Sequence, residues 1–248
     1  HSDWGYFVKE KGFNDYRGGG HSSGRLTAPL VFAGALAMQL LEEKGIKIGA
    51  HIAEIAGEED ERFDPVCPQI EQILPCGTLS EKAWERMRAK VLAAAERGDS
   101  VGGVIECAVT GVPAGAGDPF FDSVESKIAH MLFSVPAVKG VQFGKGYALA
   151  RMRGSEANDP FRISGEKVVT STNNNGGILG GIATGMPVLF DAAIKPTSSI
   201  FIEQDTVDVR EMKEAKLQVK GRHDPCIAVR AAVVIEAAAA IALSDILK

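Results

Sequence analysis

The stretch AVRAAVVIEAAAAIALSDIL, residues 228–247, is the most informative segment for the fold. Apolar side chains would lie on nearly every side of a helix drawn through it, with Arg230 and Glu236 as the main interruptions. A helix of this kind is typical of a buried core layer. Because the two charges interrupt it, and because no other apolar run is longer, we expect no membrane span in the chain.

Three further segments have the periodicity of helices. Residues 29–44 follow the start signals Thr27 and Pro29, residues 80–97 begin at a possible Ser80 N-cap, and the third segment is residues 122–135. Strand-like runs cover residues 46–56, 101–109, 138–151, 167–172, 187–194 and 206–219. Because helices and strands do not alternate regularly, an α+β fold is favoured over a doubly wound parallel sheet.

The composition is that of a soluble globular protein. With 248 residues and 45% apolar content, the chain is long enough for one large domain or two intimate halves. The net charge of −5 excludes a general basic surface for nucleic acid, so any anion must bind to a local cluster. The cysteines are widely spaced, which argues against a disulfide framework and a zinc site: Cys67, Cys76, Cys107 and Cys226.

A glycine-rich segment, RGGGHSSGR, runs from Arg17 to Arg25 just before the first long predicted helix. Backbone N–H groups, hydroxyls and two arginines at a helix start could bind an anion. The glycine spacing does not match a dinucleotide-binding fingerprint. A flexible surface loop remains an equal alternative on composition alone.

Two further loops combine polar groups with tight turns. The segment TNNNGGILGGI, residues 172–182, could hold a planar ligand, although tight turns alone would explain it better. The segment KPTSSI, residues 195–200, offers one cation and three hydroxyls that suit a phosphate. A hydroxyl-capped turn with a solvated lysine is the commoner alternative.

The segment GRHDPC, residues 221–226, leads into the apolar helix. Asp224 and Pro225 have an ordinary structural interpretation as N-cap and first helical residue. Arg222, His223 and Asp224 nevertheless place a cation, an imidazole and a carboxylate beside an apolar core, which is an unusual concentration of acid–base groups.

Taken together and in this order, these motifs resemble those of the chorismate synthase family. GGGHSSGRLTAPLVFAGAL (18–36) and GRHDPCIAVRAAVVIEA (221–237) are similar to that family's central and C-terminal signatures. GDSVGG (98–103), GVPAG (111–115), PAVKG (136–140), the Asn-rich loop and KPTSSI match as well. The resemblance covers essentially the whole chain.

The resemblance implies a sandwich of antiparallel sheets around a central helical layer, formed by residues 1–248 as one domain and assembled as a homotetramer. It implies a cytoplasmic phosphate lyase that converts 5-enolpyruvylshikimate 3-phosphate into chorismate by anti-1,4-elimination. Reduced FMN is required without net redox change, and NADPH is an external source of reducing equivalents for some members. No nucleic acid or membrane partner is expected.

The resemblance also implies site residues. His1 and Asp224 would be catalytic, the histidine protonating the reduced flavin and Asp224 acting with flavin N5 in proton removal. Arg25 and Arg222 would bind the anionic substrate. Many members have arginine where His21 stands, which implies a weaker cation here. The expected cofactor-binding residues are His21, Ser22, Ser23, Ala137, Gly180, Lys195, Pro196, Thr197, Ser198, Ser199 and Arg222.

One departure concerns the N-terminus. Family members normally have a further upstream segment with a Gly-Glu-Ser-His-Gly motif, which this sequence lacks. We therefore interpret the chain as N-terminally truncated and expect it to be catalytically poor or inert alone. Two alternatives stay open: a non-catalytic flavin-binding module of the same fold, and a cysteine hydrolase that uses Cys226 with His223.

Overall fold

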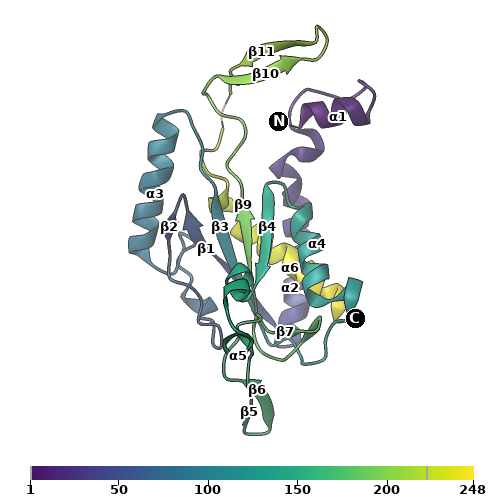
Figure 1. Cartoon of the computed structure of the whole chain (residues 1–248), viewed down its shortest axis with the longest axis vertical. Coiled ribbons are helices and arrows are strands. Elements are labelled where there is room, and N and C mark those ends of the chain that lie inside the picture. Colours follow the sequence, from purple (N-terminus) through teal and green to yellow (C-terminus); the bar gives the residue numbers. More distant parts are fainter. Residues whose placement is uncertain (1, 222) are drawn as a thin grey trace.

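The computed structural model describes residues 2–221 and 223–248. Figure 1 shows a central sheet with helices packed against it and a hairpin projecting at each end of the long axis. The α-helices are α1 (Asp3–Lys9), α2 (Thr27–Glu43), α3 (Glu81–Glu96), α4 (Val124–Ser134), α5 (Gly154–Ala157) and α6 (Ala232–Ile246).

The sheet is antiparallel and has the strand order β2-β1-β3-β9-β4. Its strands are β1 (Lys47–Ile55), β2 (Glu58–Glu59), β3 (Gly103–Thr110), β4 (Val138–Phe143) and β9 (Val188–Ile194). Three two-stranded hairpins lie outside it: β5 (Phe161–Ser164) with β6 (Lys167–Thr170), β7 (Ile178–Leu179) with β8 (Ile182–Ala183), and β10 (Gln204–Asp208) with β11 (Lys213–Leu217).

The apolar helix α6 lies in the middle of a helical layer on one face of the sheet. It packs against α2 and α4 and against strands β1 and β3. A side chain at Gly34 of α2 would overlap Ala237 of α6, so the glycine is what allows the two helices to approach so closely. Ile235, Ala238 and Leu243 are fully buried, as the uniformly apolar sequence predicts.

Helix α2 is less covered than α6. Gly34, Ala37 and Leu41 are buried, while Phe32, Leu36 and Leu40 form an exposed apolar stripe. The helical stretch Gly24–Glu43 is long and apolar enough to cross a membrane by length and composition, a test that core helices of soluble proteins also pass. Length and composition alone are weak evidence for a membrane span, so the absence of a span stays a prediction from the sequence.

The opposite face of the sheet is covered by the segment between β2 and α3. Phe63 packs there against Ala108 and Leu189, with Ile70, Ile73 and Leu79 around them. Both faces of β1, β3 and β9 are thus covered, which explains why these strands are buried almost throughout.

The α+β class is confirmed, and the four long predicted helices are found within a few residues of their expected bounds. Three expectations were wrong. The predicted strand 138–151 ends at Phe143 and continues as a 3-10 helix, Gly146–Arg151; the run 206–219 is a hairpin rather than one strand. Asp224 does not cap the last helix, because a 3-10 turn, Ala228–Arg230, precedes α6.

Candidate functional site

Four loop segments meet where β9 ends and β3 and β4 begin. The Lys195 N–H donates to the Ala137 carbonyl at 3.0 Å, the Phe201 N–H donates to Gly98 at 2.8 Å, and the Val101 N–H donates to Pro225 at 2.8 Å. Residues far apart in sequence are therefore held at one end of the sheet by backbone hydrogen bonds. In Figure 1 this is the upper end, where α2 also begins.

The loop after β9 carries the predicted phosphate-binding groups. Lys195 Nζ lies 2.7 Å from Ser198 Oγ and donates to it, so the cation and a hydroxyl converge. Ser100 Oγ donates to the Thr197 carbonyl at 2.6 Å and fixes the loop to the turn before β3. Thr197 Oγ1 is buried and has no hydrogen-bond partner in the described part of the chain. Burying a hydroxyl without a hydrogen-bond partner lowers stability. Such groups in a folded protein are therefore candidates for binding a ligand.

Ala137 joins α4 to β4 with a left-handed backbone, at φ 76°. That conformation is uncommon for a residue with a side chain and is found mostly where function or tertiary contacts require it. The Ala137 carbonyl accepts a hydrogen bond from the Lys195 N–H, so this strained residue contacts the Lys195–Ser199 loop directly.

The glycine-rich segment before α2 forms two short 3-10 turns, Gly20–Ser22 and Gly24–Leu26. Ser22 Oγ donates to the Tyr6 hydroxyl at 3.1 Å, and Ser23 Oγ accepts from the Arg25 N–H at 3.3 Å. His21 and Arg25 are exposed, so their side chains are available to a ligand. Arg17, by contrast, forms an ion pair with Asp15 at 2.9 Å, and the carboxylate partly neutralises its charge.

The C-terminal motif is partly described. Asp224 is half-buried and forms an ion pair with Arg230, at 3.1 Å between Oδ2 and NH1. Cys226 is buried, and burial raises the pKa of its thiol, which argues against a cysteine nucleophile. The predictions for His1 and Arg222 concern residues outside the described ones.

Gly180 lies away from this junction. The neighbouring Gly181 carbonyl accepts the Val124 N–H at 3.0 Å, which places the β7–β8 turn at the first residue of α4. Ala137 follows the other end of the same helix, so about 16 Å of helix separates them at 1.5 Å per residue. Within one chain, therefore, Gly180 is not brought together with Ala137 and the Lys195 loop.

The three asparagines before Gly180 have a structural role. Asp159 accepts hydrogen bonds from the Asn174 and Asn175 N–H groups at 2.7 and 2.9 Å, from Asn175 Nδ2 at 2.7 Å and from Thr172 Oγ1 at 2.7 Å. Asn173 Nδ2 donates to the Pro65 and Pro187 carbonyls, both at 2.8 Å. The turn interpretation of this loop is thus favoured over the ligand-cradle interpretation.

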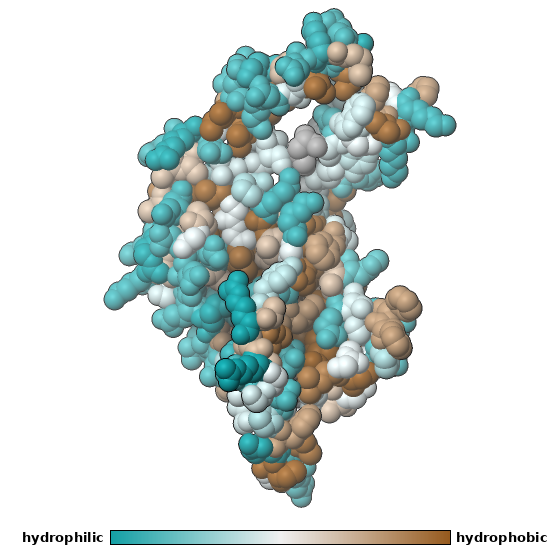
Figure 2. All heavy atoms as spheres, viewed as in Figure 1, coloured by the Kyte–Doolittle hydropathy of each residue, from teal (hydrophilic) through white to brown (hydrophobic). Residues whose placement is uncertain are grey.

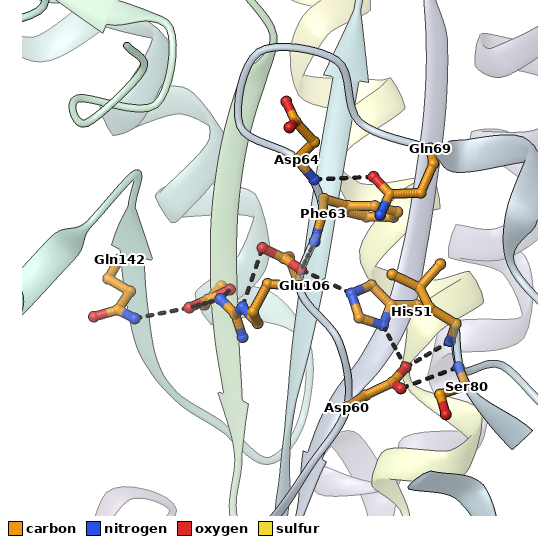
Figure 3. Close-up of polar contacts among 11 residues, drawn as sticks. His51, Asp60, Phe63, Asp64, Gln69, Ser80, Glu106 and Gln142 are labelled. Atoms are coloured by element: carbon orange, nitrogen blue, oxygen red, sulfur yellow. Dashed lines mark hydrogen bonds and ion pairs between the residues drawn. The ribbon is translucent and has the colours of Figure 1, made fainter. Parts of the chain in front are cut away.

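A polar row that the sequence did not predict crosses the other face of the sheet. His51, Glu106, Asp191 and Gln142 are successive cross-strand partners on β1, β3, β9 and β4. Fully buried His51 lies between two carboxylates: Nε2 is 2.7 Å from Glu106, and Nδ1 is 3.3 Å from Asp60 (Figure 3). The periodicity of each strand showed no sign of this row, because its members are far apart in sequence.

Arg62 completes the polar row. Its Nε lies 3.2 Å from Glu106 Oε1, and its NH2 group lies 2.5 and 2.6 Å from the Asp191 carboxylate oxygens. Burial alone would lower the pKa of Arg62, but the two carboxylates raise it. A cavity of about 500 Å³ lies beside these residues, lined also by Pro65, Met152 and Leu189. Since the cation and both carboxylates are already paired with one another, the row serves to hold the Asp60–Ser80 segment on the sheet.

Comparison with known proteins identifies the family. Residues 1–247 match the family model described as chorismate synthase. The chain is 45% identical over 246 residues to the chorismate synthase of Korarchaeum cryptofilum and 47% identical over 250 residues to that of Thermococcus gammatolerans. In both cases the aligned region covers 99% of this chain and 68% of the relative. A crystal structure of chorismate synthase matches at a TM-score of 0.79 and 27% identity, covering 99% of this chain and 70% of the other. The family model, the sequence identities and the common fold together mean that the chain belongs to the chorismate synthase family.

Proposed function

We propose that this chain carries out the reaction of its family with reduced FMN held by Ala137 and the Lys195–Ser199 loop, and that the glycine-rich segment before α2 contributes further ligands. The substrate is 5-enolpyruvylshikimate 3-phosphate, and the products are chorismate and inorganic phosphate. The observation that carries the cofactor proposal is the convergence of a lysine, serine hydroxyls and a buried unpaired threonine hydroxyl in one loop.

The residues fit a flavin phosphate. Lys195 supplies the positive charge, Ser198 already lies within 2.7 Å of it, and the Thr197 hydroxyl lacks a partner in the described chain. Charge-assisted hydrogen bonds of this kind are among the strong ones in proteins. Ser22 and Ser23 would add hydroxyls from the start of α2.

The chain's own groups would then bind the substrate and move its proton. The exposed Arg25 guanidinium suits a carboxylate or phosphate of the substrate by bidentate pairing. Asp224, oriented by Arg230, would accept the ring proton, while the phosphate leaves with the electron pair of the broken C–O bond. Reduced FMN, when bound, would supply electron density to the electron-deficient substrate ring as the phosphate leaves.

We also propose that residues 1–248 act as one cytoplasmic domain that assembles as a homotetramer. One continuous cluster of buried side chains joins the sheet to α2, α4 and α6, which supports a single cooperative unit. The exposed apolar stripe of α2 is a surface that further packing would cover.

The test is anaerobic turnover of 5-enolpyruvylshikimate 3-phosphate with excess reduced FMN, in which chorismate absorbance and released phosphate are measured together. Any turnover should release the two products in equal amounts, and residues 1–248 alone should be slow or inert. FMN binding without either product, even when the family's Gly-Glu-Ser-His-Gly segment is added to a protein whose fold is intact, would instead favour a flavin-binding module that has lost catalysis. Absence of FMN binding would contradict the cofactor proposal itself.

A further inference from the structure

A four-residue segment shortly before β3, Gly98–Val101, holds the loop that follows β9. The Phe201 N–H donates to the Gly98 carbonyl at 2.8 Å, and Ser100 Oγ donates to the Thr197 carbonyl at 2.6 Å. The first contact joins two backbone groups, whereas the second depends on the Ser100 side chain. The 98–101 segment therefore fixes the loop at two points, one on either side of its serines.

The same segment holds the C-terminal motif. The Val101 N–H donates at 2.8 Å to the carbonyl of Pro225, the residue that follows Asp224. The two held parts of the chain also touch each other, because the ring centroids of Phe201 and His223 lie 5.4 Å apart with the rings tilted by 56°. That separation is typical of favourable aromatic contact. The proposed cofactor loop and the proposed proton acceptor are thus attached to one short piece of backbone.

The fit between the 98–101 segment and the loop is also close in steric terms. A Cβ added at the next residue, Gly102, would lie 2.5 Å from the Ile194 carbonyl oxygen and 3.1 Å from Pro196 Cδ. These atoms mark the point where β9 ends and the loop begins. A residue without a side chain is therefore needed for the two backbones to approach so closely.

Each of the two held parts carries a buried polar atom that has no hydrogen-bond partner among the residues that the structure describes. These atoms are Thr197 Oγ1 in the loop and His223 Nε2 in the C-terminal motif. Burying a polar atom without a partner lowers stability, so such atoms in a folded protein call for an explanation. Two of them, in parts of the chain held by the same four residues, point to a ligand site whose two walls must stay in register.

We propose that Ser100 is a positioning residue, which through the Thr197 carbonyl keeps the FMN phosphate loop in register with Asp224. This rests on the proposed function. The Ser100 hydroxyl is bonded to the loop backbone, so its effect on the ligand passes through Thr197. Without this bond the loop would keep its backbone contact at Phe201 and lose the one at Thr197 itself. A loop that is fixed before the ligand arrives loses less conformational entropy on binding.

The experiment compares the binding of FMN and riboflavin to the unmodified protein, Ser100→Ala and Ser100→Thr by fluorescence titration. We expect Ser100→Ala to weaken FMN binding by about five- to tenfold, the loss of one hydrogen bond, and riboflavin binding by at most about twofold. Ser100→Thr keeps the hydroxyl and should recover most of the FMN affinity. A general loosening of the fold would weaken both ligands alike, so an equal loss for FMN and riboflavin would overturn the proposal.

A double-mutant cycle tests whether Ser100 acts through Thr197. In the Thr197→Val protein, Ser100→Ala should weaken FMN binding by no more than about twofold, because the two residues act as a unit. A second loss as large as the first would mean that Ser100 acts independently of Thr197, and would overturn the proposal. Ser134→Ala is the matched control, since Ser134 Oγ also donates to a carbonyl at 2.6 Å, that of Met131 in α4. It should change neither affinity.

The link to Asp224 has a readout of its own, hydrogen exchange of the Val101 amide that donates to Pro225. Saturating FMN should raise the protection factor of this amide in the unmodified protein, and much less in Ser100→Ala. Equal protection in both proteins would contradict the link. If the unmodified protein binds no FMN, the proposed cofactor site has failed. If it binds FMN and Ser100→Ala shows no selective loss, only the positioning role has failed, and the two failures are thus distinguishable.

Discussion

Glu106 and Asp191 are direct cross-strand partners on β3 and β9, and a single guanidinium, that of Arg62, contacts both carboxylates. Two like charges directly opposite each other in a sheet repel, and here each side chain is only 8% exposed. The sheet therefore depends on a residue from the loop that covers it. Loop and sheet are coupled by this contact rather than by apolar packing alone.

We predict that Arg62→Met lowers the free energy of unfolding by about 2–3 kcal/mol, because it leaves two carboxylates uncompensated in a buried position. The value lies below the usual cost of breaking a fully buried pair, since Arg62 itself is 46% exposed. Urea denaturation measures the change. Arg86→Met is the control, because Arg86 pairs with Glu58 at an exposed site and should cost at most about 1 kcal/mol.

A rescue distinguishes charge repulsion from lost packing. Adding Glu106→Gln and Asp191→Asn to the Arg62→Met protein removes both unpaired charges while keeping similar shapes. Most of the lost stability should return. If the triple variant is no more stable than Arg62→Met alone, the carboxylates are not the cause.

The loop after β9 gives a prediction about cofactor selectivity. Lys195→Ala should weaken FMN binding by at least about tenfold, the loss of a charge-assisted hydrogen bond, and should change riboflavin binding far less. Thr197→Val, which is nearly isosteric, should act in the same direction. Fluorescence titration of each ligand measures the affinities. Equal losses for FMN and riboflavin would mean that this loop contacts the ring system rather than the phosphate.

The fold was largely predictable from local sequence, because its main helices have strong periodicity and clear boundaries. Ser80 does cap α3, with its hydroxyl accepting from the Ala83 N–H. Failures occurred where local pattern and tertiary context differ. Residues 144–151 have strand-like composition, yet Gly144 and Gly146 have positive φ and end the strand. Likewise, a polar turn divides the run 206–219 into a hairpin.

The candidate site could be predicted only as separate motifs. The lysine and hydroxyls of the loop after β9 are visible in the sequence, but their position beside Ala137 at one end of the sheet depends on the long-range pairing of β3, β4 and β9. The polar row could not be predicted either, because its residues lie on strands that are far apart in the sequence. His51 looked like an ordinary strand residue because its partners, Asp60 and Glu106, carry no motif around it.

The Asn-rich loop should show acid sensitivity. Burial raises the pKa of Asp159, but hydrogen bonds from Asn175, Thr172 and Asn174 outweigh it and the pKa is lowered below 3.8. A lowered pKa gives stability that is present above 3.8 and lost as pH falls through the folded-state value. The protection factors of the amides of residues 172–177, which are exchange rates corrected for the intrinsic pH dependence, should therefore fall below about pH 4 in the native protein. In Asp159→Asn, the protection factors should already be lower at neutral pH, and their fall below pH 4 should be absent.

Helix α6 gives the opposite pH dependence. Burial raises the pKa of Glu236 above 4.5, and the Ala50 N–H, which donates to its Oε1 at 2.7 Å, offsets this only in part. A raised carboxyl pKa means that the stabilising contribution is complete below pH 4.5 and is lost as pH rises through the folded-state value.

Glu236→Gln retains an oxygen for the Ala50 N–H and removes the buried charge. We predict that it stabilises the protein at pH 7 by about 1 kcal/mol, and by much less at pH 4. Urea unfolding at both pH values measures the difference, and Glu85→Gln, at an exposed position of α3, should change stability at neither pH. A loss of stability at pH 7 in Glu236→Gln would mean that the ionised carboxylate is better accommodated in the helical layer than its burial implies.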